Sequence, residues 1–363
     1  MVLQLIKIKP LSPLHIGEPG VGVENCTSYI RSDTLFAAVC NAWALIHGRQ
    51  SLEDMLERFN TADIQNTEPP LALSSAFSML TVLDGEKSAK EYYFFPKPYS
   101  PAPPLKEPPV DEELKQKADE LMKDAKYIER EVFNNWIKGP YLLGSKEWHD
   151  FASAISAEED GLFPLIYRDQ MGTRVTLDRI SQQSQLYFFK SVNFQNSRRN
   201  NTEYIGGLFC LVSSTNELWE KFVAALKMLG DSGIGGERNI GYGRFEITPE
   251  SLTSNFFEEH ENANAYLCLS LYNPSKAELM EIAKNKDVAF YGLIQRGGWI
   301  DSPFIGAPQK KRRCFMFREG AVFRFSSPPR GRLVDVSPGQ NMPHNIYRYG
   351  IPFTVKINLS GIS

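Results

Sequence analysis

The sequence predicts an α+β protein of two domains, and three features carry this prediction. The chain has 363 residues, which exceeds the usual domain size of about 100–200 residues. Its first half runs in the order β-α-β-β…α-β, which is typical of the ferredoxin-like fold. The same opening of a strand and a capped helix returns near residue 266. We therefore predict ferredoxin-like domains over residues 1–250 and 262–363.

The first strand is expected over residues 2–9, where apolar side chains alternate with lysines. A polar, glycine-bearing loop at 15–22 separates it from a helix, which Ser32 or Asp33 is expected to cap. Apolar residues recur along one face of that helix over 35–46. Two more strands are expected, over 71–80 and 91–95.

A helical insertion is expected at about 97–140. The seven prolines between Pro96 and Pro109 favour an extended linker and exclude the interior of a sheet. A charged helix is predicted next, at about 111–137. Residues 111–131 hold eight acidic and five basic side chains, so we expect this helix to be solvated rather than to carry chemistry.

The elements after the insertion bring the chain to a glycine-rich loop. Residues 173–192 predict a long β-hairpin with a polar tip. Ser214 and Glu217 fit a capping box at the start of the next helix. The other elements expected here are a strand over 205–212, a helix over 216–229 and a strand over 243–248.

The second half begins after an acidic, asparagine-rich linker at about 249–264. Its strand over 266–272 precedes a helix that ends near Lys284, and Ser275 and Glu278 fit a capping box at the start of this helix. No second helix is visible in this half. The remaining strands are expected near 288–296, 313–325 and 353–357.

The glycine-rich loop is the most distinctive stretch. Six of the fourteen residues from Gly230 to Gly243 are glycine, and glycine lets a partner approach the backbone closely. The loop follows a helix and precedes a strand, whereas the usual nucleotide-binding loops follow a strand and open a helix. Successive N–H groups can still form an anion-binding nest, with the neighbouring arginines supplying charge. The alternative is a tight crossing without a ligand.

Composition sets further bounds. The formal net charge is −3, but residues 296–348 hold ten bases against three acids, which permits a basic stripe for a polyanion. The five cysteines are scattered and no set of residues has zinc spacing, so we expect reduced thiols, no metal and no cofactor. The first nine residues are too short and too alternating for a membrane span. We expect a cytoplasmic protein.

The loop Gly233-x-Gly-Gly-x-x-x-x-Gly-x-Gly-x-Phe245 resembles the signature loop of the RAMP superfamily of CRISPR proteins. Further stretches resemble one branch, the subunit of the type III-A (Csm) effector complex that caps the 5′ end of the guide RNA. These stretches are Ser12-Pro-Leu-His-Ile-Gly17, Arg31-Ser-Asp-Thr-Leu-Phe36, Pro96-Lys-Pro98, Thr173-Arg-Val-Thr-Leu-Asp-Arg179 and Tyr347-Arg-Tyr-Gly350.

The resemblance implies a two-domain, RRM-like protein without catalysis of its own. It would grip the repeat-derived 5′ tag of the crRNA, contact the large polymerase-like subunit and adjoin a backbone RAMP subunit, and it would meet target RNA only indirectly. The hairpin at 173–192 would be a thumb that displaces a base where tag meets guide.

Candidate RNA contacts follow from the chemistry of single-stranded RNA, which is held by backbone N–H groups, cations on phosphates and aromatic rings on bases. For the hairpin residues and the basic run at 310–313, the alternatives are cross-strand pairing and an ordinary solvated loop. The candidates in the loop are Gly233, Gly235, Gly236, Arg238, Asn239, Tyr242, Gly243 and Arg244. The others are His15, Gly17, Arg31, Ser32, Arg174, Asp178, Arg179, Arg296, Lys310, Lys311, Arg312 and Arg313.

His15 supports an enzymatic alternative. Some RAMP relatives cut precursor RNA with a histidine as general base, and histidine titrates in the range where such work is done. His15 has no serine, tyrosine or lysine partner at a readable spacing, so a histidine that supports a strand end or touches RNA is favoured. Two further alternatives are the equivalent type III-B (Cmr) subunit and a scaffold that contacts only protein.

Overall fold

The fold is described for most of the chain. The computed structural model describes residues 2–17, 26–85, 89–104, 112–139, 144–154, 162–177, 184–302, 305, 309–339 and 342–360. Within these ranges, no helix is long and apolar enough to cross a membrane.

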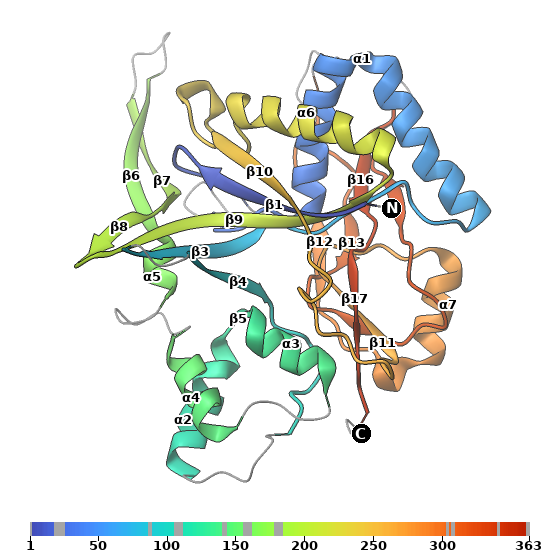
Figure 1. Ribbon diagram of the computed structural model, residues 1–363. Helices are drawn as coiled ribbons and strands as arrows, with labels where there is room; N and C mark the ends of the chain where they lie inside the picture. The colour runs from blue at the N-terminus through green and yellow to red at the C-terminus, as the bar shows by residue number, and fades with distance from the viewer. Residues whose placement is uncertain are drawn as a thin grey trace.

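The largest sheet in the described ranges is antiparallel and follows the order β10-β1-β9-β3-β4-β5 (Figure 1). Numbered as they occur in the chain, its first four strands give the order 4-1-3-2, which is that of the ferredoxin-like fold. The predicted α+β, ferredoxin-like architecture is confirmed. The bounds are β1 (Val2–Pro10), β3 (Phe77–Asp84), β4 (Lys90–Pro96), β5 (Tyr127–Glu129), β9 (Thr202–Ser214) and β10 (Phe245–Ser251), with β2 (Leu71–Leu73) and β8 (Asn196–Arg199) also pairing with β9.

Two long helices, α1 (Ser32–Gln65) and α6 (Asn216–Ser232), pack side by side over one face of this sheet (Figure 1). Apolar side chains such as Leu35 and Trp43 are fully buried between the helices and the sheet. The helix α1 bends at Gly48, whose φ of +83° lies outside the helical range.

The predicted cap of α1 is wrong. Arg31 precedes the helix, and no side chain caps it. Ser32 and Asp33 are 0% and 2% exposed, because both are held by distant segments of the chain. The Ser32 hydroxyl accepts a hydrogen bond from the Leu271 backbone N–H at 3.1 Å. This first turn is therefore a point of tertiary contact.

The two predicted capping boxes have opposite outcomes. The box at the start of α6 is absent, because the helix begins after Thr215 without a side-chain cap and Glu217 instead pairs with Arg58 at 2.9 Å. The box formed by Ser275 and Glu278 at the start of α7 (Lys276–Lys284) is confirmed, with both reciprocal hydrogen bonds present.

The single solvated helix predicted at 111–137 is wrong. The chain leaves α2 at Asp124, adds β5 to the edge of the main sheet, and enters a second helix that packs against the C-terminal strand β17. Phe133 and Trp136 of that helix are at most 4% exposed. The insertion is therefore part of the core. Its helices are α2 (Glu112–Asp124), α3 (Arg130–Lys138), α4 (Ser145–Ala154) and α5 (Phe163–Ile166).

The predicted hairpin is confirmed and is longer than expected. β6 (Tyr167–Leu177) and β7 (Ser184–Phe194) pair antiparallel and project from one end of the main sheet (Figure 1). Asp178 and Arg179, which were predicted as RNA contacts of this hairpin, lie outside the described residues.

The second half has a smaller sheet in the order β14-β11-β17. No α-helix follows α7 in the described residues of this half, in line with the sequence. Val355 and Ile357 of β17 pack into the same hydrophobic core as Phe209 and Leu211 of β9, so the two halves share one core. The bounds are β11 (Ala265–Cys268), β12 (Leu293–Arg296), β13 (Cys314–Phe317), β14 (Val322–Phe323), β15 (Arg332–Asp335), β16 (Tyr347–Gly350) and β17 (Thr354–Ile357).

Candidate nucleic-acid interface

The glycine-rich loop is fixed by contacts with the chain's own backbone. The Gly236 N–H donates to the His15 carbonyl at 2.9 Å, and the Gly243 N–H donates to the Pro13 carbonyl at 2.8 Å. Gly235 has a φ of +91°, and a Cβ there would lie 2.3 Å from the His15 carbonyl oxygen. At these positions, glycine is required by packing within the protein, in addition to anything the loop binds.

The outer part of the loop is exposed. Arg238 and Asn239 lie on a single 3₁₀ turn, and both are exposed. Gly241 has a φ of +91° with nothing within 4 Å of the position a Cβ would take. The backbone N–H of the exposed Arg244 donates to the Ser12 hydroxyl at 2.9 Å. The loop thus presents two arginines from a backbone that is held in place.

His15 connects the loop to the hairpin. His15 is 7% exposed, and its ring centre lies 4.4 Å from the Phe189 ring centre, with the two planes tilted by 31°. Its Nδ1 lies 2.7 Å from the Lys190 carbonyl oxygen. Because a carbonyl only accepts, Nδ1 carries the proton and donates this bond. The imidazole is therefore a support for the base of the hairpin.

Arg174 of β6 completes this connection. Its guanidinium lies 4.9 Å from the Phe189 ring centre and 5.7 Å from the Tyr242 ring centre. It also pairs with Glu237 of the loop at 3.6 Å. Three predicted residues from distant segments, His15, Arg174 and Tyr242, therefore meet at the junction of hairpin and loop.

A cleft of about 330 Å³, called here the basic cleft, opens beside the loop. It lies between the loop, the first turns of α1, the segment 296–301 and Lys311. Burial, reinforced by the nearby Arg348 charge, lowers the pKa of the Lys311 amine. An anion in this cleft would therefore meet a poorly solvated cation. The predicted residues that line the cleft are Gly17, Gly233, Gly235, Arg238, Arg296 and Lys311.

A buried charge network underlies the cleft. The Asp33 carboxylate accepts hydrogen bonds from Arg296 at 2.8 and 3.0 Å and also from Arg348. Burial alone would raise the pKa of Asp33, but the two guanidiniums outweigh it and hold this pKa well below its usual range. Arg348 also donates to the Gly297 carbonyl at 2.7 Å. The network ties α1 to the second half of the chain.

Besides His15, three predicted RNA contacts have buried side chains. Arg31 is 2% exposed and pairs with Glu319 at 2.8 Å, Ser32 is held as described above, and Arg296 is 5% exposed. Their side chains bind other parts of the protein. RNA contact by these residues stays a prediction, and we do not include them in the surface proposed below to face RNA.

The basic run at 310–313 lies partly inside the cleft and partly outside it. Lys311 lines the cleft, whereas Lys310, Arg312 and Arg313 are exposed outside its lining. The Lys310 amine lies 5.1 Å from the centre of the Trp299 ring, and Arg312 pairs with Asp335 at 3.5 Å.

Sequence reasoning missed an acidic member of the cleft. Asp301 pairs with Arg238 at 2.8 Å, and its carbonyl accepts a hydrogen bond from the Asn41 side chain at 3.0 Å. The signal was available, because Asp301 is the single acid between residues 296 and 318. Within the described ranges, no group of three or more His, Cys, Asp or Glu side chains could hold a metal ion.

Comparison of the sequence with models of known families identifies the family of this chain. A model of the RAMP superfamily matches residues 7–246, which contain most of the main sheet, both long helices and the whole glycine-rich loop. The chain belongs to the RAMP superfamily.

The RAMP protein's second half also has a family match. A model described as the CRISPR Csm4 C-terminal domain matches residues 261–357. The chain is 25% identical to the "CRISPR system Cms protein Csm4" of Thermococcus onnurineus (strain NA1), over 91% of this chain and 92% of that protein. It is 23% identical to the protein of the same name from Methanocaldococcus jannaschii, over 99% and 98% of the two chains.

A solved structure shares the fold of this RAMP protein. The similar chain comes from the crystal structure of a Csm1-Csm4 cassette in complex with pppApA, with a TM-score of 0.56, 18% identity, and coverage of 99% of this chain and 100% of that one. Together, the matches support a RAMP subunit of the type III-A (Csm) CRISPR systems.

Proposed function

We propose that this RAMP protein is a non-catalytic RNA-binding subunit of a type III-A (Csm) complex, which anchors the 5′ repeat-derived tag of the crRNA. The observation that carries the proposal is the convergence at the glycine-rich loop. Arg238 and Arg244 are exposed on a fixed backbone, and the loop borders a cleft that also contains Lys311. Cations and backbone N–H groups along a groove suit the phosphates of single-stranded RNA.

The hairpin has a place in this proposal as the thumb at the junction of tag and guide. His15, Phe189 and Arg174 join its base to the loop. A strand of RNA leaving the loop would therefore meet the hairpin directly.

The proposal includes two protein partners. The fold-related chain was solved in a Csm1-Csm4 cassette, and we propose that a large subunit of the Csm1 kind binds this chain as well. An adjacent backbone RAMP subunit is the second proposed partner, so that this subunit links the large subunit to the backbone.

The test is binding of a labelled single-stranded tag RNA to the purified full chain over a range of salt concentrations. We expect Arg238→Ala/Arg244→Ala to weaken binding. It should also reduce the slope of log affinity against log salt by about 0.7 for each phosphate that the protein no longer neutralises. The matched control is Lys284→Ala/Lys286→Ala, which removes two exposed lysines on and just after α7. An unchanged slope in the loop variant, or an equal weakening in the control, would contradict the proposal.

Gel analysis of labelled repeat RNA after incubation with the protein tests the nuclease alternative. If His15 supports the hairpin, the repeat RNA stays intact with and without EDTA. Cleavage that is lost in His15→Ala would instead make this protein a processing enzyme.

A further inference from the structure

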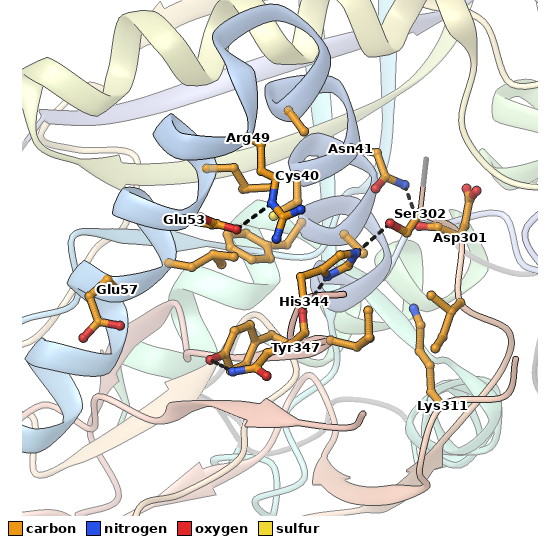
Figure 2. Close-up of a pocket in the computed structure, with 18 of the residues that line it drawn as sticks. Cys40, Asn41, Arg49, Glu53, Glu57, Asp301, Ser302, Lys311, His344 and Tyr347 are labelled. Carbon is orange, nitrogen blue, oxygen red and sulfur yellow. Dashed lines mark hydrogen bonds and ion pairs between the residues drawn. The ribbon is translucent and has the colours of Figure 1, made fainter. Parts of the chain in front are cut away.

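A second cavity lies on the other side of α1 from the main sheet. Its volume is about 390 Å³, and it is lined by α1 on both sides of the bend at Gly48 and by the segments 300–302 and 344–347 (Figure 2). We call it the α1 cavity. Neither the sequence motifs nor the proposed function assigns it a ligand.

The α1 cavity has an apolar wall and a polar part. Side chains such as Phe36, Leu52 and Ile346 supply the apolar wall. Glu53 and Glu57, one helical turn apart on α1, add carboxylates to the lining, and Glu53 also pairs with Arg49 of the same lining at 2.7 Å (Figure 2). This combination fits a flat, largely apolar group that carries hydrogen-bond donors on its edge.

The α1 cavity adjoins the basic cleft. Ala37, Asn41, Asp301 and Lys311 line both spaces, so the two cavities share a wall. A cationic space therefore lies next to a mainly apolar one. A nucleotide has the same two parts, a phosphate and a base.

We propose that the α1 cavity receives one unstacked nucleobase of the bound RNA strand, a base with an exocyclic amino group, while the adjoining phosphate lies in the basic cleft near Lys311. The inference rests on the proposed function, because it assumes that RNA follows the glycine-rich loop. Sequence-specific proteins commonly read single-stranded RNA by holding splayed bases in pockets. The carboxylates of Glu53 and Glu57 can accept from an amino group, which uracil lacks.

An apolar side chain of a partner protein is the competing occupant. The observations favour the base, because the cavity adjoins a cationic cleft and because its lining holds carboxylates suited to amino groups. The competing occupant is an outcome of the test below.

The test compares the full chain with Ala44→Trp. Ala44 is 8% exposed and lines the α1 cavity, so the indole would fill part of the space. The matched control is Ala283→Trp at an exposed position of α7. Tag RNAs with a single abasic position, moved stepwise along the strand, are the probes.

With the wild-type protein, we expect one abasic position to weaken binding by about 5-fold to about 150-fold, the range for removal of one stacked base. In Ala44→Trp the intact RNA should bind more weakly by a similar factor, and that abasic position should have no further effect. The control should keep the wild-type profile.

Glu53→Gln/Glu57→Gln is the second variant, which keeps the proposal testable if Ala44→Trp does not fold. It should reduce the preference for an amino-bearing base over uracil at that same position. An unchanged preference would overturn the assignment of the carboxylates.

Three outcomes separate the possibilities. An abasic profile that is identical in wild type and Ala44→Trp overturns the base pocket while leaving the proposed function intact. Weaker association with the large subunit, with an unchanged RNA profile, overturns it in favour of a protein side chain. Absence of salt-dependent tag binding by the wild-type chain overturns both proposals.

Discussion

The buried charge network at the start of α1 and the exposed Arg238 of the glycine-rich loop both line the basic cleft. Both have guanidiniums close to carboxylates. Asp33 is 2% exposed and contacts Arg296 and Arg348. Arg238 and Asp301, by contrast, have side chains that are 40% and 67% exposed.

The degree of burial, rather than the residue type, therefore determines what each set of ion pairs does. Breaking a buried ion pair leaves an uncompensated charge away from water, which costs several kcal/mol. An exposed pair contributes about 0–1 kcal/mol, so a phosphate can replace the carboxylate at little cost. The buried network therefore holds the walls of the cleft together, and the exposed pair is available for exchange.

The largest expected effect is that of Asp33→Asn. It leaves Arg296 and Arg348 without their shared carboxylate, so we expect the free energy of unfolding to fall by about 3–5 kcal/mol. Chemical denaturation measures this change. Asp231→Asn, at an exposed position of α6, is the control and should change stability by less than about 0.5 kcal/mol. A similar small change for Asp33→Asn would refute a structural role for the network.

Low pH should remove the contribution of Asp33 to stability. Because the pKa of Asp33 is lower in the folded protein than in the unfolded chain, its contribution to stability is present above the unfolded value of about 3.9 and is lost as the pH falls below it. The stability difference between wild type and Asp33→Asn should therefore be constant near neutral pH and shrink below about pH 4. A difference that grows with acid would contradict the assignment.

Gly235 and Gly241 allow a second comparison, because their backbone φ angles are the same. Gly235 and Gly241 both have a φ of +91°, but a Cβ at Gly235 would collide with the His15 carbonyl, whereas Gly241 faces open space. Gly241→Ala should lower the free energy of unfolding by about 1–2 kcal/mol, which is the cost of a left-handed backbone conformation alone. Gly235→Ala should cost more and should also weaken RNA binding, because the loop must move away from His15. Equal costs in thermal unfolding would show that the loop is not fixed by this contact.

His15 tests whether the hairpin depends on the loop. His15→Ala removes the donor to the Lys190 carbonyl and should destabilise the protein by about 1–3 kcal/mol. His15→Asn keeps an N–H near the place of Nδ1, so it should retain part of that stability. Denaturation curves of the two variants that coincide would argue against the hydrogen bond.

These comparisons also show what sequence can and cannot predict. The strand β1 and the capping box of α7 were predicted because their signals are local, as alternation along a strand and a pair three residues apart. The glycine-rich loop was placed correctly between α6 and β10 for the same reason.

The buried network could not be predicted in this way. Asp33 and Arg296 are separated by 263 residues, and the first turn of a helix is where a serine or an aspartate usually caps. Tertiary contact overrode that local preference. The same holds for residues 111–137, where β5 forms because the edge of β4 accepts it, although no glycine or proline marks the break.

The smallest expected effect on stability is that of Asp301→Asn. This variant tests whether a phosphate can replace the carboxylate that pairs with Arg238. Asp301→Asn removes the carboxylate that pairs with the exposed Arg238 at 2.8 Å, and we expect the free energy of unfolding to change by less than about 1 kcal/mol. RNA affinity should rise, by up to about fivefold if the full 1 kcal/mol is released, because Arg238 no longer has to leave a carboxylate to meet a phosphate. Filter binding measures the gain. Affinity that falls in Asp301→Asn would mean that Asp301 holds Arg238 in its binding position. The exposed pair would then act as the buried one does, and the distinction by burial would fail at this site.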